Sequence, residues 1–245
     1  MRPILFHWRE IKVYGYTAML YLGIVFGMIA GNYAAHLAGL NSYRIFIATL
    51  LLLIPALVAS RLLFVALHWE IYHQEPQRIW NQAEGGGALY GGLLCSLIAS
   101  VPLLSTLQIP LGAFWDIATF MLLVGTIFAR FGCLLNGCCG GRATEGWLAL
   151  YLPNYKGMWQ RRIPTQLLEA GWATLLLVAA VIFWNRMPFS GALFLSALTG
   201  YGIGRFVLES TREEQDRIGK VEIHQVISAV LVVVSLSSFL IAQAL

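Results

Sequence analysis

Long apolar segments constrain the fold of this chain more than any other feature of its sequence. Apolar residues fill 58% of its 245 positions and charged residues only 11%, whereas a soluble domain averages about 45–50% apolar and about 25% charged residues. A water-soluble fold of this length could not hide so much apolar surface, and a lipid bilayer is the alternative solvent. The sequence therefore predicts an integral membrane protein.

The apolar residues gather in seven stretches, each about long enough for a membrane-spanning helix of roughly 17–25 residues. The stretches cover residues 13–37, 45–68, 86–107, 111–135, 167–184, 189–208 and 221–244. Helix is the expected conformation, because unpaired backbone groups are costly in lipid and the stretches lack the alternation of β-barrel strands. We expect an all-α fold with about seven transmembrane helices, in a single polytopic membrane domain covering residues 1–245.

Polar connections separate the apolar stretches, and the largest is expected to form an extramembrane loop at about residues 136–164. With seven spans, this loop lies on the same side of the membrane as the N-terminus, together with residues 69–84 and 211–220. The opposite side carries only Arg44 and Arg186, so the positive-inside rule alone would make the loop side cytoplasmic. Lys and Arg do not form dense runs, and no nucleic-acid partner is expected.

Three arginines lie inside the apolar stretches, where a charge costs roughly 2.5–3.5 kcal/mol or more. Arg61, Arg130 and Arg205 all fall in the halves nearer the loop side, as do Glu169 and Glu209. Snorkelling or a structural ion pair, such as Arg205 with Glu209 four residues later, would explain any one of them. Three arginines in one leaflet favour a shared polar cavity, and planar guanidiniums suit the phosphate of a lipid head group.

Glycines bracket Tyr90 in the third stretch, at residues 85–87 and 91–92. Such glycines let a neighbouring helix approach closely, or they let a helix break over a cavity. The sequence alone leaves both interpretations open.

The densest motif of the chain covers residues 129–142, where an intramembrane arginine meets thiols and glycines. Cys133, Cys138 and Cys139 could be reactive, because a basic neighbour lowers the pKa of a thiol. Cysteines are also common as small buried apolar residues. Their spacing matches no familiar zinc pattern, so the sequence predicts no metal or cofactor.

Five blocks of sequence follow one another in a characteristic order: YG at 14–15, EGGGALYGGL at 84–93, RFGCLLNGCCGGR at 130–142, IPTQLLE at 163–169 and RFVLESTR at 205–212. Together they resemble the prolipoprotein diacylglyceryl transferases, inner-membrane enzymes of bacterial lipoprotein maturation. The resemblance implies seven helices with the N-terminus and active site on the periplasmic side. It also implies transfer of a diacylglyceryl group from phosphatidylglycerol, an anionic phospholipid, to the cysteine thiol of a lipobox-bearing preprotein.

The resemblance implies roles for single residues as well. Arg130 and Arg205 would hold the lipid phosphate, and the basic loops would handle phosphate rather than set the topology. The predicted substrate-binding set joins the matching blocks with the intramembrane arginine of the second stretch: Tyr14, Arg61, Asn136, Gly141, Arg142, Glu209 and Arg212.

The chain departs from the family pattern where the chemistry would take place. Tyr90 stands where the family has histidine, Cys133 replaces the signature asparagine, and Cys138 replaces the acidic residue after Asn-Gly. A tyrosine titrates at about 10 and a histidine at about 6.5, so Tyr90 is the weaker base at neutral pH. The predicted catalytic set is Tyr90, Arg130, Cys133, Cys138, Cys139 and Arg205.

Three functions are compatible with these features. The first is a phospholipid-dependent diacylglyceryl transferase. The second is a membrane thiol enzyme that uses the three clustered cysteines for covalent transfer or redox chemistry. The third is a non-catalytic lipid-binding or transport protein on the same scaffold.

Overall fold

The computed structural model describes residues 4–8, 11–73, 75–80, 89–153, 157–213, 217–218 and 221–244. Seven helices of 18 or more residues dominate this part of the chain, and each coincides with one predicted apolar stretch. They are α1 (Gly15–Leu37), α2 (Ser42–Leu67), α4 (Leu89–Thr106), α5 (Leu111–Asn136), α6 (Thr165–Phe183), α7 (Ala192–Glu209) and α8 (Ile223–Ala244).

Five segments of the described chain are long and apolar enough to cross a membrane. These are α1, α2, α5, α8 and the segment Thr165–Arg186, which joins α6 to the short helix η3 (Trp184–Arg186). The prediction of an all-α membrane protein with several spanning helices is confirmed. Helices α4 and α7 are not among these five long apolar segments, so the count of seven spans remains a prediction.

Short elements connect the long helices. They comprise α3 (Trp69–Tyr72), η1 (Pro76–Trp80) and three antiparallel hairpins, which pair β1 (Ile4–Trp8) with β2 (Ile11–Tyr14), β3 (Leu150–Pro153) with β4 (Trp159–Arg162), and β5 (Arg217–Ile218) with β6 (Val221–Glu222). The β3–β4 hairpin lies within the predicted loop at residues 136–164.

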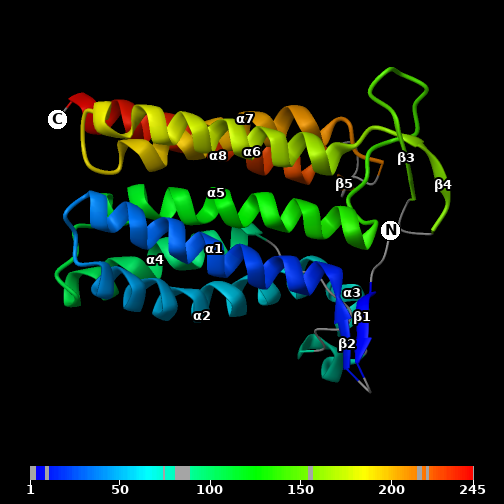
Figure 1. Cartoon of the computed structure of the whole chain (residues 1–245), viewed down its shortest axis with the longest axis horizontal. Helices are drawn as coiled ribbons and strands as arrows, with labels where there is room; N and C mark the ends of the chain where they lie inside the picture. Colours follow the sequence, from blue (N-terminus) through cyan, green and yellow to red (C-terminus); the bar gives the residue numbers. More distant parts are fainter. Residues whose placement is uncertain are drawn as a thin grey trace. The chain divides into compact units, whose positions relative to one another are not determined.

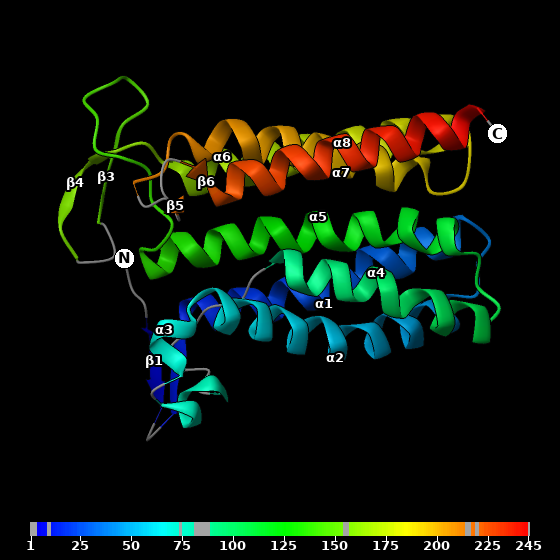
Figure 2. The ribbon, with the colours of Figure 1, turned by 180° about the vertical axis from the view of Figure 1, so that it is seen from behind.

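The chain forms two compact units. The first contains Met1–Ala34 and Trp115–Leu245, and the second contains Ala35–Phe114. Whether the two behave as one membrane domain remains a prediction. In the second unit, α2 and α4 run side by side (Figures 1 and 2).

Close glycine contacts hold α4 to α2 in the second unit. A Cβ at Gly91 would lie 2.8 Å from the carbonyl oxygen of Ala59, and one at Gly92 would lie 2.9 Å from that of Ala56. Of the two interpretations of the glycine-rich segment, close helix packing therefore applies to Gly91 and Gly92. The glycines at 85–87 lie outside the described residues.

In the first unit, α1 packs against α5 through a row of glycines spaced four residues apart. A Cβ at Gly23 would lie 3.0 Å from Cβ of Phe128, and one at Gly27 would lie 2.9 Å from the carbonyl oxygen of Met121. Gly31 continues the row and faces the Met121 side chain. Small residues at this spacing bring membrane helices together where lipid offers no hydrophobic drive.

A carboxylate of α5 connects this helix to α7 by binding the backbone at the start of α7. Asp116 of α5 is buried, and its two oxygens accept the backbone N–H groups of Gly191, at 2.7 Å, and Phe194, at 3.0 Å. An acidic side chain is favourable at a helix N-terminus, where N–H groups lack partners within the helix. Asp116 thus caps α7 from the neighbouring helix.

Alanine in place of Gly27 should destabilise the first unit, because the added Cβ would overlap the Met121 carbonyl. Overpacking of this kind costs about 1–3 kcal/mol, and we expect a lower midpoint of thermal unfolding in detergent micelles. Gly171→Ala is the matched control, since a Cβ there meets no atom within 4 Å and alanine favours helix by about 1 kcal/mol. Equal midpoints for the two variants would contradict a packing role for the glycine row.

Candidate functional site

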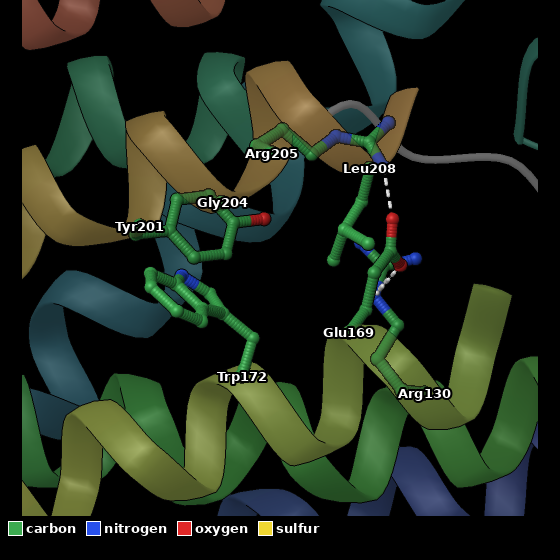
Figure 3. A pocket seen from close by; sticks show the side chains of 7 residues that line it. All are labelled: Arg130, Glu169, Trp172, Tyr201, Gly204, Arg205 and Leu208. Carbon is green, nitrogen blue, oxygen red and sulfur yellow. Dashed lines mark hydrogen bonds and ion pairs between the residues drawn. The ribbon is translucent and has the colours of Figure 1, made fainter. Parts of the chain in front are cut away.

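Glu169 is the centre of the polar cluster in the first unit. This buried carboxylate stands near the start of α6, where its side chain is 6% exposed, and it forms ion pairs with three guanidiniums. Arg130 of α5 lies 2.6 Å away, Arg205 of α7 lies 2.5 Å away, and Arg212 beyond the end of α7 lies 2.8 Å away. Figure 3 shows Arg130 and Arg205 reaching Glu169 from separate helices.

A second buried carboxylate completes this cluster. Glu209 pairs with Arg205, one helical turn before it, at 2.9 Å and with Arg212 at 3.4 Å. Arg205 thus has the i+4 partner that the sequence suggested, and it shares Glu169 with Arg130. A polar cavity common to Arg61, Arg130 and Arg205 remains a prediction. The five side chains carry three positive charges and two negative ones, so the cluster has one positive charge in excess.

Backbone hydrogen bonds join three of the sequence blocks beside this cluster. The N–H of Gly141 donates to the carbonyl of Ile163 at 3.2 Å, and the N–H of Arg142 donates to the carbonyl of Thr211 at 2.9 Å. A Cβ at Gly141 would lie 2.5 Å from Oγ1 of Thr165, so this glycine permits the close approach of the segments. Arg142 contributes its backbone here, while its residue surface is exposed.

The same end of the first unit also holds the beginning of α1. A Cβ at Gly132 of α5 would lie 3.3 Å from the Tyr16 ring, which places the N-terminal end of α1 beside the C-terminal end of α5. The β3–β4 and β5–β6 hairpins lie at this end too (Figure 1). The structure thus places the loop after α5 and the segment after α7 at the end where α1 begins, as expected.

The three thiols come together because α5 ends in a Schellman turn. Gly137 adopts φ 75°, its N–H donates to the carbonyl of Leu134 at 3.2 Å, and the N–H of Cys138 donates to the carbonyl of Cys133 at 3.1 Å. Cys139 follows with φ 58°, a left-handed conformation that is uncommon outside glycine. The reversed chain places the sulfur atoms of all three cysteines within 4.8 Å of one another.

Contacts from neighbouring residues fix this turn. Gln166 of α6 donates its Nε2–H to the carbonyl of Cys138 at 2.7 Å, and the Asn136 side chain hydrogen-bonds the Cys138 thiol. All three thiols are free rather than paired in disulfides. The thiol cluster is therefore held by α5, its own turn and α6.

The electrostatic surroundings separate the two cysteines outside the helix. Hydrogen bonds from Cys133 and Cys138, with help from Arg212 and Arg130, hold the pKa of Cys139 well below its usual value against the effect of burial. For Cys138, the hydrogen bond with Cys133 lowers the pKa, but the bond with Cys139 and burial outweigh it and raise the pKa. Hydrogen bonds from the other two thiols thus outweigh burial at Cys139, and the balance is the reverse at Cys138.

A narrow pocket lies against the ion-pair cluster. The residues that line it come from α5, α6 and α7 (Figure 3): Arg130, Glu169, Trp172, Tyr201, Gly204, Arg205 and Leu208. Trp172 donates its Nε1–H to the carbonyl of Gly200 at 3.0 Å, and its indole fills the space that a side chain at Gly204 would need. The pocket combines guanidiniums with aromatic and apolar walls.

Sequence reasoning left several of these residues out of the predicted site. Glu169 was noted as an intramembrane charge and as part of a matching block but was not placed in the site, yet it is the shared partner of three arginines. Trp172 follows Glu169 by three residues, and Tyr201 precedes Arg205 by four. Residues at these spacings share one face of a helix, so the sequence did contain a signal that each aromatic residue lies on the same face as a charged residue. Tyr16, near the thiols, carried no such signal.

Three predicted residues belong to elements that contribute none of the ion pairs described above. Tyr14 ends β2 and is 44% exposed. Arg61 belongs to the second unit, where its Nε–H donates to the carbonyl of Ile79 at 2.7 Å and its guanidinium lies 5.4 Å from the centre of the Tyr72 ring. Tyr90 stands in the first turn of α4 in the same unit. Participation of these three residues in the site remains a prediction.

Comparison with known proteins gives consistent matches over nearly the whole chain. The family model described as prolipoprotein diacylglyceryl transferase matches residues 3–241. A phosphatidylglycerol–prolipoprotein diacylglyceryl transferase of Bacillus cytotoxicus is 28% identical over 240 residues, which cover 94% of this chain and 88% of the relative. A protein of the same name from Bacillus cereus (strain B4264) is 30% identical over 236 residues, which cover 91% of this chain and 86% of the relative. Another, from Clostridium botulinum (strain 657 / Type Ba4), is 26% identical over 243 residues, which cover 96% of this chain and 96% of the relative.

Glu169→Gln should destabilise the first unit strongly, because it leaves the buried guanidiniums without their shared counter-charge. Removing one partner of a buried ion pair costs about 3–5 kcal/mol, and thermal unfolding in detergent should show a large drop in the midpoint. Glu145→Gln, at an exposed position of the loop after α5, is the control and should unfold like the unchanged protein. If Glu169→Gln also unfolds like the unchanged protein, the carboxylate does not organise the cluster.

Proposed function

Because the chain belongs to the prolipoprotein diacylglyceryl transferase family, we propose that it moves a diacylglyceryl group from phosphatidylglycerol to the cysteine thiol of a lipobox-bearing preprotein. The observation that carries this proposal is the buried arginine cluster with one positive charge in excess. A phosphodiester head group carries the one negative charge that would balance it. The names of the curated relatives support the same substrates.

The guanidiniums of Arg130 and Arg205 are the proposed phosphate ligands. Both line the pocket, and Glu169 already holds each of them at 2.6 Å or less. Because their side chains are ordered before lipid arrives, binding a phosphate does not have to immobilise them. Trp172 and Leu208 form apolar wall beside them, which suits the glycerol backbone and the first part of the acyl chains.

In the proposed reaction, the acceptor thiol loses its proton and its sulfur attacks the lipid's glycerol carbon that bears the phosphate ester. The C–O bond to phosphate breaks, a thioether forms, and glycerol phosphate leaves with the bonding electron pair. The phosphate gains negative charge as this bond breaks. Arginines that face the phosphate therefore stabilise the transition state more than the bound lipid, which raises the rate rather than the affinity alone.

We also propose that the site faces the periplasm from the bacterial inner membrane. The long apolar helices support a membrane location. The basic residues near the cluster have partners within the protein: Arg162, for example, pairs with Glu213 at 2.6 Å. Arginines held in this way serve the fold or the site, which weakens their value as signals of a cytoplasmic side.

Arg130→Ala and Arg205→Ala should each lower turnover by about 100-fold or more, the usual effect of removing one donor that stabilises developing charge. Lysine at either position should restore only part of the rate, because it lacks the planar fork. The measurement is release of glycerol phosphate from phosphatidylglycerol in the presence of a lipobox peptide. Arg186→Ala is the control, since Arg186 is exposed in η3 at the far end of α6.

The same assay separates the rival functions. Full activity in both alanine variants would overturn the phosphate site. If the unchanged protein binds phosphatidylglycerol but releases no glycerol phosphate with the peptide present, the non-catalytic lipid-binding alternative replaces the transferase.

The periplasmic orientation predicts which exposed positions an impermeant thiol reagent reaches. Glu145 lies in the loop after α5, and Arg186 lies beyond the other end of α6. In cells with a permeabilised outer membrane, Glu145→Cys should be labelled and Arg186→Cys should not, after subtracting the labelling of the native cysteines in the unchanged protein. The reverse pattern would place the site on the cytoplasmic side.

A further inference from the structure

We propose that Cys133, Cys138 and Cys139 bind a zinc ion whose fourth coordination position takes the acceptor thiol. This inference rests on the proposed transferase function and names the group that activates its acceptor. The three sulfur atoms already lie within 4.8 Å of one another. Zn–S bonds of about 2.3 Å in a tetrahedral site set sulfur atoms about 3.8 Å apart, so each pair has to approach by no more than about 1 Å.

The ligand set selects the class of metal ion. Thiolates favour thiophilic ions such as zinc over magnesium or calcium, which prefer oxygen. Among the described residues, the group of possible ligand atoms contains these three sulfurs and no carboxylate or imidazole. Three protein ligands with a fourth position left over are typical of catalytic zinc sites, whereas structural sites use four.

The charge of the surroundings fits a divalent ion. Three thiolates and Zn²⁺ sum to one negative charge, and the arginine–glutamate cluster has one positive charge in excess. Arg130 stands one turn before Cys133 on α5, and Arg212 acts electrostatically on Cys139. Before the lipid phosphate and the acceptor thiol bind, the two clusters thus neutralise each other, whereas a monovalent ion would leave one negative charge uncompensated in a largely buried region.

The backbone holds the three ligands before any metal arrives. The Schellman turn brings Cys138 back over Cys133, and its carbonyl is fixed by Gln166 at 2.7 Å. Cys139 adopts a left-handed conformation that non-glycine residues seldom take unless the surroundings impose it. In this conformation the Cys139 thiol lies beside the other two thiols, so the strained backbone serves to complete the ligand set.

Zinc would deprotonate the acceptor thiol, a task for which the predicted base Tyr90 is poorly suited. Tyr90 is a phenol, a group that ordinarily titrates at about 10, and it is a poor proton acceptor at neutral pH. A thiol that coordinates zinc is deprotonated outright. The chain can therefore generate an acceptor thiolate without a histidine in that position.

The step balances without any redox change. The acceptor thiol occupies the open position and gives its proton to water. Its sulfur attacks the glycerol carbon of the lipid held at Arg130 and Arg205, and the C–O electron pair departs with glycerol phosphate. The product sulfur is a neutral thioether, a weaker zinc ligand than a thiolate, so the lipidated preprotein can leave.

Metal binding is tested first, with full-length, tag-free protein in detergent. After exposure to zinc and desalting, the unchanged protein should retain about one zinc per chain by elemental analysis, consistent with a single three-thiolate site. Each single Cys→Ser variant at 133, 138 and 139 should lose affinity by more than the roughly 10–100-fold that an outer-shell partner contributes. Cys95→Ser, in α4 of the second unit, should bind normally. Equal zinc in the triple Cys→Ser variant, or none in the unchanged protein, overturns the proposal.

The role of the open position is tested with cobalt in place of zinc. Sulfur-to-cobalt charge-transfer absorption should appear in the unchanged protein, and adding a lipobox peptide should shift its ligand-field bands. A peptide with serine instead of cysteine should leave them unchanged. If the cysteine peptide also leaves them unchanged, the acceptor does not bind the metal and the proposal fails.

Turnover distinguishes failure of this inference from failure of the proposed function. Removing zinc with a chelator should lower glycerol phosphate release at least 100-fold, the order of rate effect expected for loss of an activated nucleophile, and adding zinc back should restore it. Undiminished turnover without zinc overturns the zinc site and leaves the transferase intact. Zinc binding with the cobalt shift but without turnover supports the thiol site and contradicts the transferase.

Discussion

The ion pairs around Glu169 are the interaction on which the rest of the first unit depends. Three guanidiniums from α5, α7 and the segment after α7 converge on one carboxylate of α6. Apolar helix faces in lipid give little directional information, because lipid tails are as apolar as the helices themselves. A shared buried carboxylate supplies that direction, since leaving any one of the charges unpaired would be costly. The cluster therefore specifies which helix ends meet and how they face.

The excess of positive charge connects this structural role to chemistry. Buried ion pairs are a weak source of stability, since desolvation offsets much of their attraction. In the proposed transferase their value would lie in preorganisation: the donors are already placed, and they would need no rearrangement when negative charge develops beside them. At the nearby thiol cluster, hydrogen bonds from Cys133 and Cys138 hold the pKa of Cys139 low despite burial, and Arg212 and Arg130 add to this effect.

Much of the fold could be predicted from the sequence, because membrane helices are encoded locally by their length and hydropathy. The end of α5 at Asn136 and the pairing of Arg205 with Glu209 were also local signals. The partnership of Glu169 with three arginines was not, since the residues come from blocks far apart in the chain. The proximity of the three thiols could not be predicted for another reason. Their spacing in the sequence fits no known ligand pattern, and only the Schellman turn, which reverses the backbone, brings the sulfur atoms together.

Asp116 has a consequence for how α5 and α7 can move. It binds the first turn of α7 near one end of α5, while Arg130 near the other end reaches the same carboxylate as Arg205. The two helices are thus fastened at both ends of their shared length. Sliding one along the other by a single residue, a rise of about 1.5 Å, would break polar contacts at both places at once. Their register is locked, and access for a lipid must come from side-chain rearrangement or from other helices.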